Sequence, residues 1–204
     1  FIPKNIIKND FFLHSEFYDK NGDPYPNSNK DIIEKFESIT GIKERRYADK
    51  NHNTSDLATL ASKEAIKDAG IDKEEIDYII LAHNFGEIDH GTNQYIALPS
   101  VATLVKHKLE IKNDNCVAYD IIFGCPGWVE GIIQAKAFIN SGMAKKCLVI
   151  GADTLSRTVD KNDRDSLIFA DGAGASIIEE SQEQGVLSLI CPLAVLLQPL
   201  PFDH

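Results

Sequence analysis

The sequence contains few of the features that mark membrane proteins or nucleic-acid-binding proteins. No apolar stretch reaches the roughly 18–20 residues that a membrane-spanning helix needs, and we expect no signal peptide at its start. Long runs of Lys and Arg are also missing, and the net charge of −10 disfavours binding to nucleic acid or to an anionic membrane. The sequence therefore predicts a cytoplasmic protein that contacts neither nucleic acid nor membrane.

Cysteine is scarce, and its spacing excludes the common zinc sites. The four cysteines stand at Cys116, Cys125, Cys147 and Cys191, without a Cys-x-x-Cys pair and without a nearby His pair at metal-ligand spacing. Cys116 and Cys147 lie in apolar runs that are typical of buried strands, where a free thiol behaves as a small hydrophobic side chain. We therefore expect a reducing compartment and no metal site.

What is present is the composition of an ordinary globular protein. Of the 204 residues, 43% are hydrophobic and 25% are charged, which is enough to bury a substantial core. The chain begins at Phe1 without a methionine, and its last residues are apolar and interrupted by prolines. We expect a fragment of a longer protein, with one folded unit over residues 1–188 and an atypical tail over residues 189–204.

The order of apolar segments predicts strands and helices that alternate. This pattern is typical of a layered α/β fold with a central mixed sheet. Thr54 or Ser55 is expected to cap the second helix and Gly70 to end it. Residues 1–28 read mainly as loop with a short helical turn near 9–13, and 83–94 and 157–165 also read as loops. The predicted helices cover residues 29–38, the stretch from the Thr54 or Ser55 cap to residue 69, 96–108 and 126–141, and the predicted strands cover 76–82, 115–122, 146–152 and a strand pair or bent strand at 168–178.

The stretch 116–142 predicts a buried strand, a tight turn and a helix that begins directly after Cys125. Pro126 suits the first position of that helix, and Gly124 and Gly127 permit a cramped backbone. Gly142 supplies a stop at the carboxyl end. A thiol beside a helix N-terminus is stabilised as a thiolate, which is the nucleophilic form. Cys125 is therefore a candidate nucleophile, although the spacing alone also fits a core thiol.

Two further segments each allow two interpretations. Residues 171–174, Asp-Gly-Ala-Gly, resemble part of a phosphate-binding loop, but a strand rather than a helix follows them. We favour glycines that let backbones pack closely near an active centre. The basic segment 43–47 is either a solvated connection or a local binding spot for an anionic ligand.

The loop at 83–94 carries a possible acid–base cluster. His83, Glu87 and His90 share this one predicted loop. Surface loops often contain histidines without a chemical role, so the ordinary interpretation is favoured over a catalytic one.

Several motifs in a fixed order resemble those of β-ketoacyl-acyl-carrier-protein synthase III, a thiolase-like condensing enzyme. Over residues 1–188 the resemblance implies the N-terminal half of a thiolase-like layered α/β/α/β/α fold, with the Cys125 helix buried between layers. The motifs are Tyr-Asp-Ile-Ile-Phe-Gly-Cys-Pro-Gly-Trp (119–128), Leu-Val-Ile-Gly-Ala-Asp-Thr-Leu-Ser-Arg (148–157), Phe-Ala-Asp-Gly-Ala-Gly-Ala (169–175), Phe-Ile-Pro-Lys-Asn (1–5) and Thr-Gly-Ile-Lys-Glu-Arg (40–45).

The resemblance also implies roles for individual residues. Cys125 would accept the acyl group, and its own backbone N–H would form one side of the oxyanion hole. Arg164 falls where family members contact the coenzyme A nucleotide, and Leu98 falls where they shape the acyl pocket of the partner subunit. Lys35 and Ile39 stand where the family often has the Trp and Arg that sandwich the adenine. The acyl donor is therefore either acyl-CoA or an acyl carrier protein.

The implied reaction is a decarboxylating Claisen condensation, as in fatty acid synthesis. An acyl thioester would load Cys125, and malonyl-acyl carrier protein would supply the carbon nucleophile for a 3-oxoacyl product, without a metal or redox cofactor. The family's catalytic His and Asn belong to a second half that follows this chain. We therefore expect a homodimeric acyltransferase whose 204-residue chain cannot complete the condensation alone.

Two other classes stay open from the sequence. One is a thiolase relative with different chemistry, such as a hydroxymethylglutaryl-CoA synthase or a long-chain head-to-head condensing enzyme, with an acid near Glu87 as the base. The other is a non-catalytic partner subunit, which would have no need of the Cys125 thiol.

Overall fold

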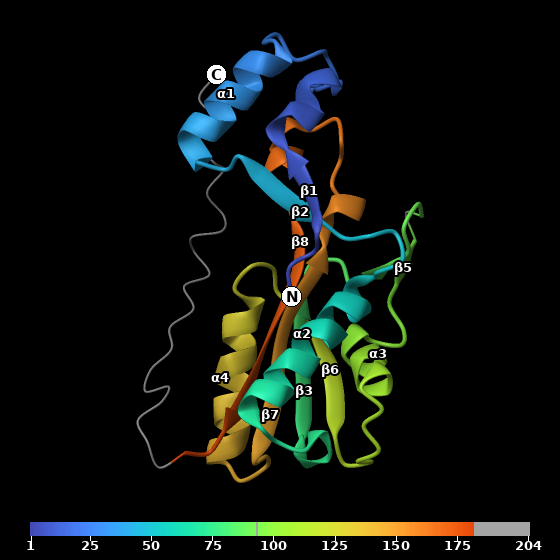
Figure 1. Ribbon diagram of the computed structural model, residues 1–204, viewed down its shortest axis with the longest axis vertical. Coiled ribbons are helices and arrows are strands. Elements are labelled where there is room, and N and C mark those ends of the chain that lie inside the picture. Colours follow the sequence, from blue (N-terminus) through green and yellow to red (C-terminus); the bar gives the residue numbers. More distant parts are fainter. Residues whose placement is uncertain (93, 182–204) are drawn as a thin grey trace.

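A computed structural model describes residues 1–92 and 94–181, and the predicted tail at 189–204 lies outside them. Figure 1 shows a central sheet covered by α2, α3 and α4, and a smaller lobe at one end that contains α1, β1 and β2. The helices are α1 (Asn29–Thr40), α2 (Thr54–Ala69), α3 (Val101–Lys108) and α4 (Gly127–Asn140), with 3₁₀ helices η1 (Asn9–His14), η2 (Lys73–Glu75), η3 (Leu155–Arg157) and η4 (Arg164–Ile168). The strands are β1 (Asn5–Lys8), β2 (Glu44–Tyr47), β3 (Tyr78–His83), β4 (Glu87–Ile88), β5 (Tyr95–Ile96), β6 (Val117–Ile122), β7 (Lys146–Thr154) and β8 (Asp171–Glu179).

The central sheet places three strand ends along one edge. Its strand order is β6-β3-β7-β8, and β3 pairs in parallel with both β6 and β7. β8 runs antiparallel to β7. The carboxyl ends of the parallel strands, at His83, Ile122 and Thr154, therefore share an edge. Ligands of open α/β sheets bind at such an edge.

Both faces of the sheet are buried, as the apolar sequence of β3 predicts. Side chains alternate along β3, so that Ile79 and Leu81 face α2 and α3, whereas Ile80 faces α4. The side of α4 that faces the sheet is buried. Its outer side carries Ala137 and Asn140, which are exposed, so the described residues cover α4 on one side only. The second layer expected over this helix is not supplied by residues 1–92 and 94–181.

The lobe around α1 has its own small core. Ser28 caps α1 by accepting a hydrogen bond from Asp31 N, and Gly41 ends the helix in the left-handed conformation with a φ of 71°. This confirms the helix predicted over residues 29–38, which extends two residues further. Its apolar face packs on η1 and η4 through Phe12, Phe17, Ile32, Ile33, Phe36 and Leu167.

The sequence interpretation missed the β1–β2 ribbon in this lobe. The two strands pair antiparallel from Asn5↔Tyr47 to Lys8↔Glu44. Both interpretations of the basic segment were wrong for Arg45, which is 4% exposed and lies 4.9 Å from the centroid of the Phe12 ring. Burial lowers the pKa of this guanidinium. A buried Arg in a short polar strand hides the alternation from which a strand is normally predicted.

Three element boundaries differ from the prediction because of local contacts. α3 begins at Val101 rather than at residue 96, since residues 95–96 form β5 and pair with β4. The residue that precedes α2 is Asn53, whose backbone N–H donates to Asp56 Oδ2 at 2.9 Å. Of the two alternatives for residues 168–178, the strand pair is wrong, because one continuous strand, β8, covers residues 171–179 and residue 168 belongs to η4.

Candidate active site

Helix α4 lies unusually close to the sheet because glycines line its inner side. A Cβ placed on Gly127 would lie 2.8 Å from Ala82 Cβ, and one on Gly131 would lie 2.7 Å from Val149 Cγ1. Both distances are too short for a real side chain, so these positions require glycine. The spacing i, i+4 puts both glycines on one face of the helix. They hold the start of α4 against the carboxyl ends of β3 and β7.

Cys125 lies in the turn between β6 and α4, which we call the cysteine turn (residues 123–126). Gly124 has a φ of 75°, and its carbonyl oxygen accepts a hydrogen bond from Gly127 N at 2.9 Å. Pro126 is the residue that precedes the helix, one position earlier than predicted. The turn presents Cys125 at the carboxyl edge of the sheet, beside the positive end of α4.

Exposure separates Cys125 from the other described cysteines. Cys125 is exposed, whereas Cys116 and Cys147 are buried, as predicted. Burial raises the pKa of Cys116, and it raises the pKa of Cys147 to about 12. At neutral pH these two thiols stay protonated and inaccessible. Among the three described thiols, only Cys125 is placed to react with a molecule from solution.

Asn84 and Asp153 lie beside the cysteine turn and were missed by the sequence interpretation. The backbone N–H of Asn84 donates to Asp153 Oδ1 at 2.9 Å, and its Nδ2 donates to Oδ2 at 2.7 Å. Burial raises the pKa of the Asp153 carboxyl, against the opposing effect of the hydrogen bonds from Asn84. The available signal was that both polar residues stand near the carboxyl ends of largely apolar parallel strands, where side chains gather at one edge.

The proposed cluster of His83, Glu87 and His90 does not exist. His83 is 1% exposed, with its Nε2 3.1 Å from Asp120 Oδ2. Asp120 also accepts hydrogen bonds from the first backbone N–H groups of α3, at 2.7 and 2.8 Å, and so caps that helix. His90 is exposed on the loop. The three side chains serve different parts of the fold.

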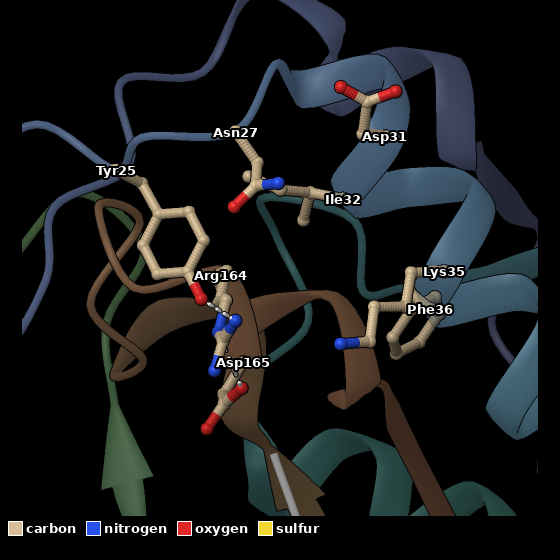
Figure 2. Close-up of a pocket in the computed structure, with 8 residues that line it drawn as sticks. All are labelled: Tyr25, Asn27, Asp31, Ile32, Lys35, Phe36, Arg164 and Asp165. Carbon is tan, nitrogen blue, oxygen red and sulfur yellow. Dashed lines mark hydrogen bonds and ion pairs between the residues drawn. The ribbon is translucent and has the colours of Figure 1, made fainter. Parts of the chain in front are cut away.

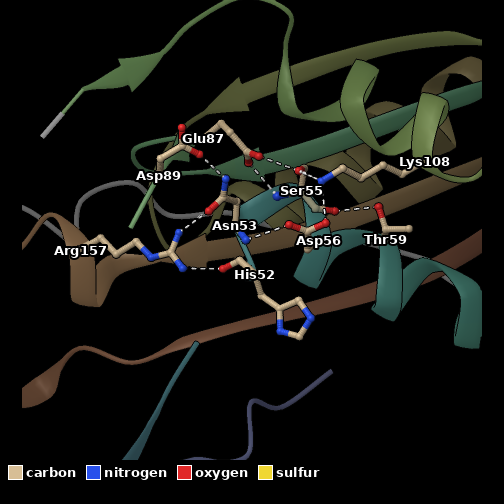
Figure 3. A network of polar contacts seen from close by, with 9 residues as sticks. All are labelled: His52, Asn53, Ser55, Asp56, Thr59, Glu87, Asp89, Lys108 and Arg157. Carbon is tan, nitrogen blue, oxygen red and sulfur yellow. Dashed lines mark hydrogen bonds and ion pairs between the residues drawn. The ribbon is translucent and has the colours of Figure 1, made fainter. Parts of the chain in front are cut away.

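Glu87 is committed to the start of α2. Its Oε2 accepts a hydrogen bond from Ser55 N at 2.8 Å, and its Oε1 accepts one from Ser55 Oγ at 2.7 Å. Lys108 Nζ donates to the same Ser55 hydroxyl at 2.7 Å and to Asp56 Oδ1 at 2.6 Å. Figure 3 shows this buried carboxylate joined to the amino end of the helix. Both carboxylate oxygens of Glu87 are therefore used to fix the start of α2.

Arg157 ties the same loop to the segment before α2 (Figure 3). Its Nη1 donates to Asn53 Oδ1 at 2.6 Å and to the Ile88 carbonyl oxygen at 2.7 Å, and its Nη2 donates to the His52 carbonyl oxygen at 2.5 Å. Burial lowers the pKa of Arg157, with nearby acidic groups opposing the shift. The sequence interpretation assigned no role to Arg157, because its partners lie far away along the chain.

Arg164 lies in a separate pocket of about 120 Å³ between η4 and α1. Its guanidinium carbon is 4.5 Å from the centroid of the Tyr25 ring, and its Nη1 donates a hydrogen bond to the Tyr25 hydroxyl. Lys35 lines the same pocket, and Figure 2 shows the two cationic groups entering it from opposite walls. The pocket also contains the acidic residues Asp31 and Asp165.

Leu98 is a highly exposed residue on the segment that precedes α3. Its exposed fraction is 85%, the largest among the exposed large hydrophobic residues described. It stands three positions before Val101, the first residue of α3. The backbone N–H of Val101 donates a hydrogen bond to Asp120 of β6. Leu98 therefore projects into solvent from the segment that α3 and β6 hold.

The 171–174 segment is part of the sheet and not a phosphate loop. The Asp171 carboxylate accepts hydrogen bonds from Ala48 N and Ser156 N, at 2.7 and 2.9 Å. Of the two glycines, Gly172 would place a Cβ 3.6 Å from the Phe1 carbonyl oxygen, whereas a Cβ on Gly174 would meet no atom within 4 Å. Neither position is too crowded for a side chain, so the prediction that these glycines allow close packing of backbones is not supported.

The described part of the chain contains neither a metal-binding cluster nor a membrane-spanning helix. Within residues 1–92 and 94–181, no three His, Cys, Asp or Glu side chains come together as a metal-binding group. In the same part of the chain, no helix combines the length and the apolar character that crossing a membrane requires.

Comparison with known proteins finds one family over the segment that contains Cys125. The family model for 3-oxoacyl-[acyl-carrier-protein] synthase III matches residues 119–191. A β-ketoacyl-[acyl-carrier-protein] synthase III of Neisseria meningitidis serogroup C is 41% identical over 168 residues, which are 78% of this chain and 50% of the relative. Synthase III 1 of Vibrio parahaemolyticus is 45% identical over 150 residues, 73% of this chain and 44% of the relative.

The fold matches as well. The crystal structure of 3-oxoacyl-[acyl-carrier-protein] synthase III from Aquifex aeolicus superposes with a TM-score of 0.72 at 34% identity, covering 90% of this chain and 52% of that one. The mixed α/β architecture is thus the thiolase-like fold, as predicted, and the chain spans about half the length of the relatives it matches. By sequence and by fold, the chain belongs to the β-ketoacyl-[acyl-carrier-protein] synthase III family and corresponds to the N-terminal portion of its members.

Proposed function

We propose that Cys125 is the acyl-accepting nucleophile of a decarboxylating Claisen condensation. The observation that carries the proposal is that Cys125 is the one exposed thiol among the three described and stands where α4 begins, at the carboxyl edge of the sheet. Its thiolate attacks the carbonyl carbon of an acyl thioester, a new carbon–sulfur bond forms, and the donor thiol leaves with a proton. The backbone N–H of Cys125 stabilises the negative oxygen of the tetrahedral intermediate, which forms on attack and before the donor thiol leaves.

The second half-reaction needs groups that the described residues around Cys125 do not supply. Malonyl-acyl carrier protein loses carbon dioxide, and the resulting enolate attacks the acyl-Cys125 thioester to release a 3-oxoacyl product. Neither His83 nor His90 suits the decarboxylation step, because His83 is buried against Asp120 and His90 lies on a surface loop. A His and an Asn of the remaining half of the protein would assist this step.

The position of Glu87 supports this reaction over the related ones. A hydroxymethylglutaryl-CoA synthase or a head-to-head condensing enzyme would use an acid near Glu87 as its base. Both oxygens of Glu87 accept hydrogen bonds from Ser55, so this carboxylate is not available to a substrate. An exposed Cys125 also argues against a non-catalytic partner subunit, in which the thiol would have no use.

We propose that the pocket around Arg164 receives the nucleotide of acyl-CoA. Arg164 and Lys35 offer positive charge to phosphate groups, and the Tyr25 ring offers an aromatic face. Acyl carrier protein is the alternative donor, and it presents the same thioester without the nucleotide. Loading from acyl-CoA should therefore depend on Arg164, whereas loading from acyl carrier protein should not.

Replacement of Arg164 is expected to distinguish the two donors. Arg164→Ala should slow the loading of Cys125 from acyl-CoA by roughly 10- to 150-fold, since a charge-assisted contact with a phosphate contributes on the order of 1.5–3 kcal/mol. Loading from acyl carrier protein should stay unchanged. Lys30→Ala is the matched control, because Lys30 is an exposed cation on α1 that does not line the pocket. Equal slowing with both donors, measured by mass spectrometry of the protein, would contradict nucleotide binding at this pocket.

We further propose a homodimer in which Leu98 contributes to the acyl pocket of the partner subunit. β6 is the edge strand of the sheet, and its Val117 and Ile122 are 46% and 67% exposed. An unpaired edge strand is a template for pairing with another chain, and two copies related by a two-fold axis would use the same edge. Leu98 lies on the segment that β6 holds through Asp120, so it would face such a partner.

Sedimentation velocity of the 204-residue chain is expected to show a dimer that Ile122→Lys converts to a monomer. A charged lysine on an edge strand opposes pairing of strands. Ile39→Lys is the control, since Ile39 is 57% exposed on α1, far from the edge of the sheet. If the chain sediments as a monomer, or if both variants dissociate alike, the β6 interface is wrong.

A further inference from the structure

The residues that face α4 form regular rows on the sheet, and these rows continue beyond the strand ends. On β3, Ile80 lies under Gly131 and Ala82 lies under Gly127, with Cβ approaches of 3.5 and 2.8 Å. Alternation along the strand puts Asn84 next in the same row. A Cβ placed on Gly124 would lie 3.6 Å from Asn84 Oδ1. Asn84 therefore lies directly under the cysteine turn.

Asp153 ends the neighbouring row on β7. Val149 contacts the Gly131 position, and Gly151 lies under Trp128, whose Cβ would be 3.4 Å from a Cβ at that glycine. Alternation puts Asp153 on the same face, two residues beyond Gly151, the last residue of β7 that pairs with β3. Both rows thus end in a polar residue next to the start of α4.

Beyond the last backbone pair of β3 and β7, a side-chain carboxylate replaces the backbone carbonyl as hydrogen-bond acceptor. The last pair between β3 and β7 is Ala82↔Gly151, and beyond it Asn84 N donates to the Asp153 carboxylate instead of to a backbone carbonyl. The Asn84 amide donates to the second oxygen of the same carboxylate. Two hydrogen bonds to one carboxylate fix both the backbone and the side-chain plane of Asn84. This orientation leaves Asn84 Oδ1 facing Gly124.

We propose that Asn84 and Asp153 are positioning residues for Cys125, a role that rests on the proposed function of this thiol. The pair supports the cysteine turn from below and holds its backbone while the thiol is presented to the donor thioester. Neither side chain bonds to the acyl group. Asp153 acts through Asn84, and Asn84 acts through the Gly124 backbone.

Amide hydrogen exchange tests this role without reference to activity. In the 204-residue chain, Asn84→Ala and Asp153→Asn should each speed exchange in a peptide covering residues 123–128 by about tenfold, because a hydrogen bond to a charged group is lost or weakened. Asn140→Ala, at the exposed far end of α4, should leave it unchanged. Unchanged exchange at 123–128 in both folded variants would overturn the proposal.

Thiol chemistry separates positioning from general loss of stability. Loading of Cys125 from an acyl thioester should fall about tenfold in Asn84→Ala, whereas the buried Cys116 and Cys147 should stay protected from iodoacetamide. Faster labelling of these two thiols would show global opening and would contradict a local role. If the unmodified chain takes up no acyl group, the function proposed for Cys125 is wrong, while the exchange result still decides whether Asn84 and Asp153 hold the turn.

Discussion

Cys125→Ala is expected to abolish the transfer of an acyl group from a thioester donor to this chain. Cys125 is the exposed thiol of the three described, whereas burial keeps Cys116 and Cys147 protonated and out of reach. Buried thiols react only after local or global opening, so their labelling should be slower by on the order of 100-fold or more. Mass mapping after exposure to acyl thioester or iodoacetamide should place the modification on the peptide that contains Cys125.

Two controls sharpen this prediction. Cys116→Ala should load normally, because Cys116 is buried away from the cysteine turn, and Cys125→Ser should lose nearly all loading, since a hydroxyl is not ionised at neutral pH. Acyl groups found on Cys116 or Cys147 in the folded chain would contradict the assignment.

The loaded chain should still release no carbon dioxide from malonyl-acyl carrier protein. Robust release by the 204-residue chain alone would refute the need for a His and an Asn from the remaining half.

Gly131→Val is expected to destabilise the fold by about 3 kcal/mol, at the upper end of the cost of overpacking a core. A Cβ alone would lie 2.7 Å from Val149 Cγ1, and valine adds two methyl groups at the same place. Gly131→Ala should cost roughly 1–2 kcal/mol, because the gain in helix propensity offsets part of the clash. Urea denaturation followed by circular dichroism measures both values.

The matched control is Gly174→Ala, at a position where a Cβ would meet no atom within 4 Å. It should change the free energy of unfolding little. The double variant Val149→Ala, Gly131→Ala should lose less free energy of unfolding than the sum of the two single variants, since the two side chains compete for one space. A Gly131→Ala variant as stable as the unmodified chain would show that α4 does not depend on this close approach.

Much of the architecture follows from local sequence patterns. The apolar runs of β3, β6 and β7, and the glycine that ends α1, are each recognisable within about ten residues, because periodicity and caps are short-range properties. Cys125 was also found in this way, since the turn glycine, the proline and the following apolar helix are contiguous with it. The motifs around it placed the chain in its family.

Contacts between distant segments could not be predicted in this way. Asn84 meets Asp153 only because β3 and β7 are neighbours in the sheet, and Arg164 meets Tyr25 only because η4 packs beside the α1 lobe. His83 and Glu87 lie close together in the sequence, but His83 contacts Asp120 whereas Glu87 contacts Ser55.

The sequence by itself thus predicted Cys125 as the candidate nucleophile and most of the elements around it, since these patterns depend on neighbours along the chain. Only the tertiary structure decided that Cys125 is exposed rather than a core thiol, what supports the cysteine turn and which polar residues are structural. These properties depend on strand order and on how closely α4 approaches the sheet.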